Sequence, residues 1–139
     1  MMHLTIVSLE REIFSQEIDF VVLEAQDGQV GIYPNHAPLL SVLKPGLVRV
    51  HLHNQNHPEM FFISGGVLEV FNNKASILAD TVERSTELDE EKVLKEQELA
   101  LKATQNHNIN LSEGREMFYN DLQVLLAKIE AVRYIKKKY

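Results

Sequence analysis

The segment "GLVRVHLHNQNHPEMFFISG" contains three histidines and one glutamate, which are types that bind metal ions, and His51, His53 and Glu59 are the candidate ligands. His51 and His53 lie two residues apart on a predicted strand, so both point to one face of it. Glu59 follows a predicted turn, "NQNHP". A catalytic metal usually has three protein ligands, and the next histidine along the chain after this segment, His107, lies in a predicted break between helices. We therefore predict an exposed hairpin arm without a metal site, and keep a metal-dependent barrel enzyme as an alternative hypothesis.

A general base is the other chemistry that the sequence offers. His36 follows Asn35 in "GIYPNHAPLLSVLKPG", a segment rich in proline and glycine. Neither nearby serine has the context of a nucleophile, because Ser41 lies in an apolar run and Ser64 lacks the pattern of a nucleophile elbow. The glycines do not have the spacing of a phosphate loop or a dinucleotide fingerprint. We predict no catalytic residue and no cofactor, and the residues alone leave open whether this loop serves as a surface for a partner.

The composition restricts the classes of partner. Of the 139 residues 45% are hydrophobic and 24% are charged, which is typical of a folded globular protein. The net charge of -6 argues against nucleic acid as a partner, and the absence of cysteine excludes disulfides and thiol chemistry. The N-terminus does not have the pattern of a signal peptide, and no apolar stretch approaches the roughly 20 residues of a membrane helix. We expect a cytoplasmic protein that reaches a membrane only through a partner.

The chain changes character near residue 86. All four prolines and five of the six glycines lie at or before Gly66, and this part alternates between apolar and polar residues as short strands do. The predicted strands include "HLTIVSLE", "IDFVVLEA", "LVRVHLH", "MFFISGGVLEVF" and "KASILADTV". We predict an antiparallel β-sandwich or barrel over residues 1–86, with a bulge or sharp bend at Ser64-Gly65-Gly66.

The remaining residues, 87–139, have helical periodicity. A capping pattern at Thr86 and Asp89 begins a first helix, and a second begins near Ser112. The second carries an apolar stripe with alternating spacings of four and three, formed by Phe118, Leu122, Leu125, Ile129 and Val132. Two helices alone bury little apolar surface, so this hairpin is a candidate for a switch between docked and extended arrangements.

Three segments together resemble one family. "GQVGIYPNHAPLLSVLKPGLVRV", "FFISGGVLEV" and "ASILADTVER" with "LDEEK" are similar, in this order, to the ε subunit of bacterial F-type ATP synthases. The resemblance implies a non-catalytic subunit of the central stalk, which turns with the rotor and helps couple proton translocation to ATP synthesis. It also implies a peripheral location at the cytoplasmic face of the bacterial inner membrane.

The resemblance assigns two contact regions to the β domain. A turn facing the ring of c subunits is expected at Gly28, Gln29, Val30 and Gly31. The contact with the γ subunit is expected at or near His36, Ala37, Pro38, Leu39 and Leu40. Loops stiffened by proline lose little conformational entropy on docking, which agrees with this assignment.

The hairpin is the regulatory part in many members. Extended along γ, its second helix enters the head of α and β subunits and blocks ATP hydrolysis. The basic residues expected to contact the head are Arg133, Lys136, Lys137 and Lys138. The sequence leaves open whether this hairpin inhibits.

Some members also bind ATP in the docked hairpin. Leu88 and Asp89 match their motif, whereas Lys92 replaces its arginine and Val93 its alanine. Lysine lacks the forked grip of arginine on phosphate. We expect ATP binding to be weak or absent, with an ATP-sensing module as the alternative function.

Overall fold

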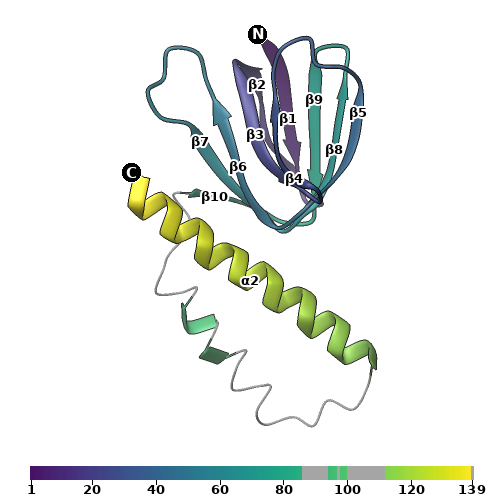
Figure 1. Ribbon diagram of the computed structural model, residues 1–139, viewed down its shortest axis with the longest axis vertical. Helices are drawn as coiled ribbons and strands as arrows, with labels where there is room; N and C mark the ends of the chain where they lie inside the picture. The colour runs from purple at the N-terminus through teal and green to yellow at the C-terminus, as the bar shows by residue number, and fades with distance from the viewer. Residues whose placement is uncertain (86–93, 97, 100–111, 139) are drawn as a thin grey trace. The chain divides into compact units, whose positions relative to one another are not determined.

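The computed structural model describes residues 1–85, 94–96, 98–99 and 112–138 (Figure 1). The chain divides into two compact units, Met1–Ser85 and Thr86–Tyr139. The first unit contains ten strands: β1 Met2–Val7, β2 Glu12–Ile18, β3 Phe20–Ala25, β4 Gly28–Ile32, β5 Leu39–Leu43, β6 Gly46–His51, β7 Glu59–Ile63, β8 Gly66–Phe71, β9 Lys74–Ala79 and β10 Val82–Arg84.

The strands form one sheet that curves into a β-sandwich. Its order is β10-β7-β6-β3-β5-β8-β9-β1-β2, and β4 pairs with β3 outside this path. Figure 1 shows the hairpin of β6 and β7 on one side and the strands β5, β8, β9 and β1 on the other. All pairs are antiparallel except β1 and β9, which run parallel. The predicted fold class is confirmed, with this parallel pair as the one difference.

The period of two in the sequence sets the two faces of the sheet. In β1 the side chains of Met2, Leu4 and Ile6 are buried, and those between them are half-buried. The strand β9 alternates in the same way. The inward side chains form one core, drawn entirely from the first unit and including Leu4, Ile6, Phe14, Ile18, Val21, Leu23, Ile32, Val48, Val50, Phe61, Leu68, Val70 and Ile77.

Three local predictions need correction. The strand β2 is absent from the prediction because it buries few side chains, among them Phe14 and Ile18, so its apolar signal is weak. The segment Gly31–Gly46 is not one loop, since it contains the whole of β5. Ser64-Gly65-Gly66 forms a sharp bend, as expected, but this bend separates β7 from β8, which were predicted as one strand.

The second unit contains a long helix, α2, Ser112–Lys138. It begins where the sequence predicts the second helix. Leu125, Ile129 and Val132 of the predicted stripe are buried and form a cluster, which confirms this part of the stripe. Residues 94–96 and 98–99 are helical, and the rest of the first predicted helix lies outside the described residues. In the part of the chain that the structure describes, no helix combines the length and the apolar character needed to cross a membrane.

The bend at Gly66 yields the first prediction. Its φ of 156° is rarely adopted by other residues, and a Cβ atom there would lie 2.1 Å from the carbonyl oxygen of Leu78. Gly66→Ala should therefore lower the free energy of unfolding by about 3 kcal/mol, as for other severe backbone conflicts. Urea unfolding followed by circular dichroism would measure the loss.

Gly31→Ala is the matched control. A Cβ atom at Gly31 would meet the ring of Tyr33 at 3.2 Å, and that side chain is 54% exposed and contacts the ring of Phe20. We expect a change within about 0.5 kcal/mol, which is typical of tolerant surface sites. Equal losses in the two variants would contradict the role given to Gly66.

Candidate interaction surface on the β unit

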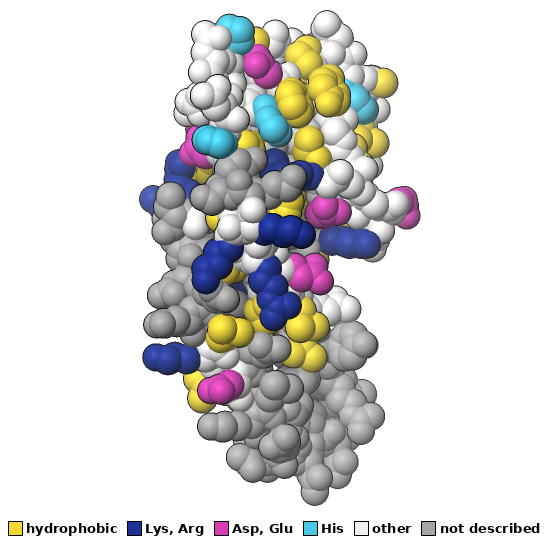
Figure 2. Space-filling model, turned by 60° about the vertical axis from the view of Figure 1, so that its left-hand side comes forward, with side chains coloured by type: hydrophobic (Ala, Val, Ile, Leu, Met, Phe, Trp, Pro, Cys, Tyr) yellow, Lys and Arg dark blue, Asp and Glu magenta, His cyan; other side chains and the backbone are white. Residues whose placement is uncertain are grey.

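The side chains with metal-binding chemistry do not form a joint site. His51 is the last residue of β6 and stacks on Phe20, with ring centroids 4.1 Å apart. His53 lies in the turn beyond and is 3.5 Å from the carboxylate of Asp19. Glu59 forms an ion pair with Arg84. Within the described ranges no three potential ligands come together, and the histidines visible in Figure 2 lie apart from one another.

The side chains considered for acid–base or nucleophilic chemistry have local hydrogen bonds. The Nδ1 atom of His36 is 2.7 Å from the carbonyl oxygen of Ala37. The hydroxyl of Ser64 accepts a hydrogen bond from the N–H of Thr81 at 3.1 Å, bracing the bend between β7 and β8. The hydroxyl of Ser41 lies 3.4 Å from the carbonyl oxygen of Val42. These contacts are structural, and they give none of the three residues the geometry of a nucleophile and its base.

The outer face of β5, β8 and β9 is unusually apolar for an exposed surface. Leu40 is 73% exposed, Phe71 58%, and Val42 and Leu78 52% each. Val67 pairs with Val42 on one side and with Leu78 on the other, so one end of this face carries an apolar row across three strands. Contiguous apolar patches of this kind are typical of interaction sites.

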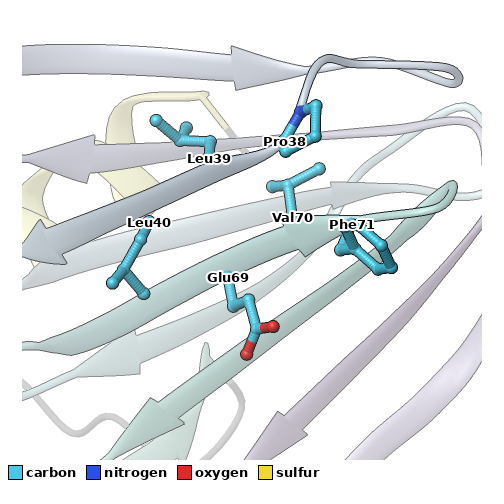
Figure 3. A pocket seen from close by; sticks show the side chains of 6 residues that line it. All are labelled: Pro38, Leu39, Leu40, Glu69, Val70 and Phe71. Carbon is cyan, nitrogen blue, oxygen red and sulfur yellow. The ribbon is translucent and has the colours of Figure 1, made fainter.

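A shallow groove lies where β5 and β8 run side by side. It has a volume of about 480 Å³ and is lined by Pro38, Leu39, Leu40, Glu69, Val70 and Phe71. Leu40, Glu69 and Phe71 project from one face of the sheet, whereas Val70 points to the other (Figure 3). Three of the residues predicted to contact γ therefore line one groove together with β8, a strand to which the sequence assigned no such role.

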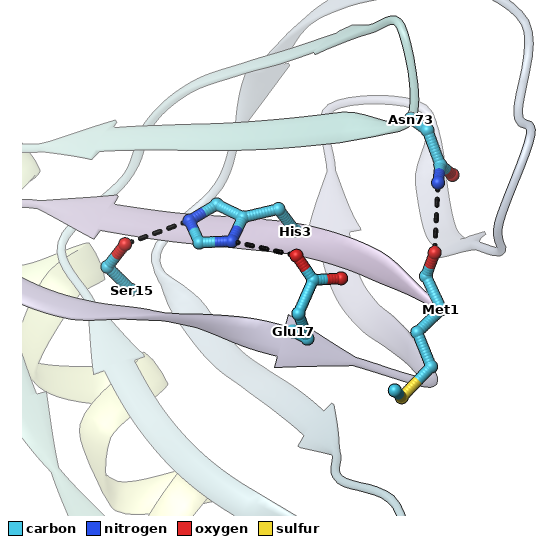
Figure 4. Close-up of polar contacts among 5 residues, drawn as sticks. All are labelled: Met1, His3, Ser15, Glu17 and Asn73. Atoms are coloured by element: carbon cyan, nitrogen blue, oxygen red, sulfur yellow. Dashed lines mark hydrogen bonds and ion pairs between the residues drawn. The ribbon is translucent and has the colours of Figure 1, made fainter.

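The loop that leads into β5 is held by a distant turn. The side-chain oxygen of Asn73 accepts a hydrogen bond from the N–H of Asn35 at 2.9 Å. The side-chain nitrogen of Asn73 donates to the carbonyl oxygen of Met1 at 2.9 Å (Figure 4). Nearby on β1, His3 contacts Ser15 and Glu17 of β2, at 2.9 and 3.3 Å. Asn73 thus fixes the position of the His36 loop, a role that sequence spacing gives no means of finding.

The four residues predicted to form a turn facing the ring of c subunits belong to a strand instead. Gly28, Gln29, Val30 and Gly31 belong to β4, which pairs with β3, and the turn consists of Gln26 and Asp27. The prediction of a turn is wrong because Val30 packs against the core and the backbone continues the sheet. Gln29 is exposed and donates a hydrogen bond to Glu24 at 3.3 Å.

Of the basic residues assigned to the head, Arg133, Lys136 and Lys137 are exposed on α2. The side chain of Lys138 lies outside the description, and so do Leu88, Asp89 and Lys92.

The exposed apolar face of the β-sandwich makes the first unit a candidate interaction domain. The family described as "ATP synthase, Delta/Epsilon chain, beta-sandwich domain" matches residues 1–85. The chain is 38% identical to the ATP synthase epsilon chain of Nitrosococcus oceani over 137 residues, 99% of this chain and 96% of that one. It is 35% identical to the epsilon chain of Herminiimonas arsenicoxydans over the same shares. The chain belongs to the ATP synthase epsilon chain family.

Solved structures show the same fold at lower identity. A chain of the Euglena gracilis mitochondrial ATP synthase, solved as OSCP, F1 and c-ring, has a TM-score of 0.75 and 22% identity, with 89% of this chain and 76% of that chain covered. A chain of the Tetrahymena thermophila central stalk and c-ring has a TM-score of 0.63 and 16% identity, with 94% and 96% covered.

The bracing role of Asn73 is tested by Asn73→Gly. Glycine keeps the left-handed backbone, φ 61°, but removes both side-chain hydrogen bonds. The amide of Asn35 should then exchange with solvent about tenfold faster, in line with the net strength of one hydrogen bond. Hydrogen exchange by NMR would measure it. Asn54→Gly is the control, since Asn54 has a φ of 62° in another turn; an unchanged rate in Asn73→Gly would contradict the bracing role.

The stacking of His51 on Phe20 leads to a prediction about the pKa of His51. Burial lowers the pKa of His51 below 6.5, Arg49 lowers it further, and Asp19 opposes them. Between the two pKa values the folded state thus binds fewer protons than the unfolded state, so this contribution to stability is complete above pH 6.5 and is lost as the pH falls from 6.5 through the lower pKa of the folded state. Phe20→Ala should raise the pKa of His51 toward 6.5 by exposing the ring, as measured by NMR titration. Phe71→Ala should leave it unchanged, and an unchanged value in Phe20→Ala would refute the desolvation argument.

Proposed function

We propose that this chain is the non-catalytic ε subunit in the central stalk of a bacterial F-type ATP synthase. The observation that carries the proposal is the identity of 35–38% to ATP synthase epsilon chains over nearly the whole chain. Solved chains of the same fold belong to structures of F1 with its c-ring and of a central stalk. In this role the chain turns with the rotor, couples proton translocation to ATP synthesis and lies at the cytoplasmic face of the inner membrane.

The outer face of β5 and β8 is the proposed contact with γ. Its exposed apolar side chains lose unfavourable hydration when a partner covers them, at about 25 cal/mol per Å² of apolar area. The groove beside Pro38, Leu39 and Leu40 gives such a partner a concave seat, and the neighbouring loop of His36 and Ala37 is held in place by Asn73. Docking then requires little ordering of the surface, which favours affinity.

The exposed edge of β4 is the proposed contact with the c-ring. The side chain of Gln29 is exposed, uncharged and able to donate and accept hydrogen bonds. A polar surface of this type suits the polar loops of a ring of membrane subunits. Contact with the membrane then occurs only through the complex.

The helical unit is the proposed brake on ATP hydrolysis. The exposed cations Arg133, Lys136 and Lys137 near the end of α2 suit the acidic loops of the head, and Lys138 extends this group in sequence. Cations in the last turn are favoured by the helix dipole as well. The candidate residues of an ATP sensor, Leu88, Asp89 and Lys92, lie outside the described residues, and ATP sensing stays the alternative hypothesis.

A truncation separates the two units. The full chain and a chain ending at Thr86, each added to an F1 complex stripped of its ε subunit, should bind with similar affinity, because the core of the β unit is drawn only from its own residues. Only the full chain should slow ATP hydrolysis, by a factor of several. Surface-based binding and a coupled ATPase assay would measure both.

Charge reversal provides a control that keeps the chain length. The triple variant Arg133→Glu, Lys136→Glu, Lys137→Glu should bind F1 but inhibit ATP hydrolysis less. Its three new carboxylates would repel the acidic loops that the cations are proposed to contact. Binding of both chain lengths without inhibition would reject the brake and keep the stalk subunit. Failure of both to bind would reject the stalk subunit itself.

A further inference from the structure

One charged residue lies within the apolar outer face. Glu69 is exposed on β8 and projects to the same side as Leu40 and Phe71 (Figure 3). It pairs across the sheet with Leu40 on β5 and with Ser76 on β9, while Val67 and Phe71 flank it along its own strand. Four of its neighbours on this face are thus uncharged, and three of them are apolar.

The carboxylate of Glu69 has no counter-ion among the described residues. The ion pairs of His3 with Glu17, His53 with Asp19 and Arg84 with Glu59 all involve other carboxylates. Lys74, the cation next to it on this face, is in register with Phe71 and so lies diagonal to Glu69. Because Glu69 is exposed, water hydrates its carboxylate, and any partner that covers the groove must displace this water.

We propose that Glu69 selects the partner by its charge: the segment that docks in this groove is apolar and presents one arginine or lysine to the carboxylate of Glu69. The inference rests on the proposed function, in which this segment belongs to γ. Covering an unpaired carboxylate with apolar groups alone carries a desolvation penalty that opposes binding. A partner cation removes most of that penalty, and arginine is best suited because its planar guanidinium grips both carboxylate oxygens.

The net negative charge of the β unit also favours a basic partner segment. Residues 1–85 contain ten aspartate and glutamate residues against five lysine and arginine residues. Such an excess attracts a basic segment at long range, and Glu69 is placed to fix its register within the groove. The apolar side chains supply the contact area, and the carboxylate rejects segments whose matching position is apolar or acidic.

The test measures binding of the full chain to an F1 complex stripped of ε, at about 50 and 300 mM salt. Glu69→Gln keeps the shape and removes the charge, and it should weaken binding about tenfold or more at low salt, with a smaller salt dependence. Glu69→Lys should weaken binding by at least another factor of ten. Asp27→Asn and Asp27→Lys are the matched controls, because Asp27 is exposed in the turn between β3 and β4 and does not line the groove, and they should bind as the unmodified chain does.

The outcomes separate this inference from the proposed function. Unchanged binding of both Glu69 variants, with tight binding of the unmodified chain, overturns charge selection and leaves the stalk subunit in place. Equal weakening by the Asp27 variants attributes the effect to net charge and also overturns it. No binding by the unmodified chain rejects both proposals. If sedimentation shows that Glu69 variants change self-association and not binding to F1, the groove receives a second copy and the inference is wrong.

Discussion

Pairing between the first strand and a strand near the end of the β unit is the constraint on which this structure depends. The strand β1 lies between β2 and β9, and its parallel pairing with β9 joins residues more than 70 positions apart. This pairing brings the inward side chains of β1 and β9 into the same core as those of β8. With those faces turned inward, Val67, Glu69 and Phe71 have to face outward, because successive side chains of a strand alternate. The exposed apolar face is thus a consequence of how the sheet closes.

The β unit combines a stable core with a surface that is prepared for docking. The bend at Gly66 places β8 beside β5, and the hydrogen bonds of Asn73 hold the loop that leads into β5. An apolar surface that is already ordered needs little rearrangement on binding. In our proposal, a single carboxylate within that surface adds selectivity, since its burial is favourable only opposite a cation.

The histidines that suggested a metal site have structural contacts instead. On the strand, His51 and His53 suggested a shared face, but β6 ends at His51 and the chain then turns. His51 stacks on the cross-strand ring of Phe20, and Arg84 engages Glu59. Each potential ligand therefore has a nearer partner. Burial lowers the pKa of His51. Protonation of this histidine at acidic pH therefore lowers the stability of the β unit.

The sequence by itself determined the class of fold, the face to which most strand residues point and the family. Alternation, turn residues and helical periodicity are local properties, and "GIYPNHAPLL" with "SGGVLEV" identifies relatives directly. Only the tertiary structure decided which strands are neighbours. Leu40 and Glu69 share a groove although 29 residues separate them, and Asn35 and Asn73 share a hydrogen bond across 38. A period of two fixes the face of a side chain but carries no information on its neighbour in the next strand, because that depends on how the whole sheet pairs and closes.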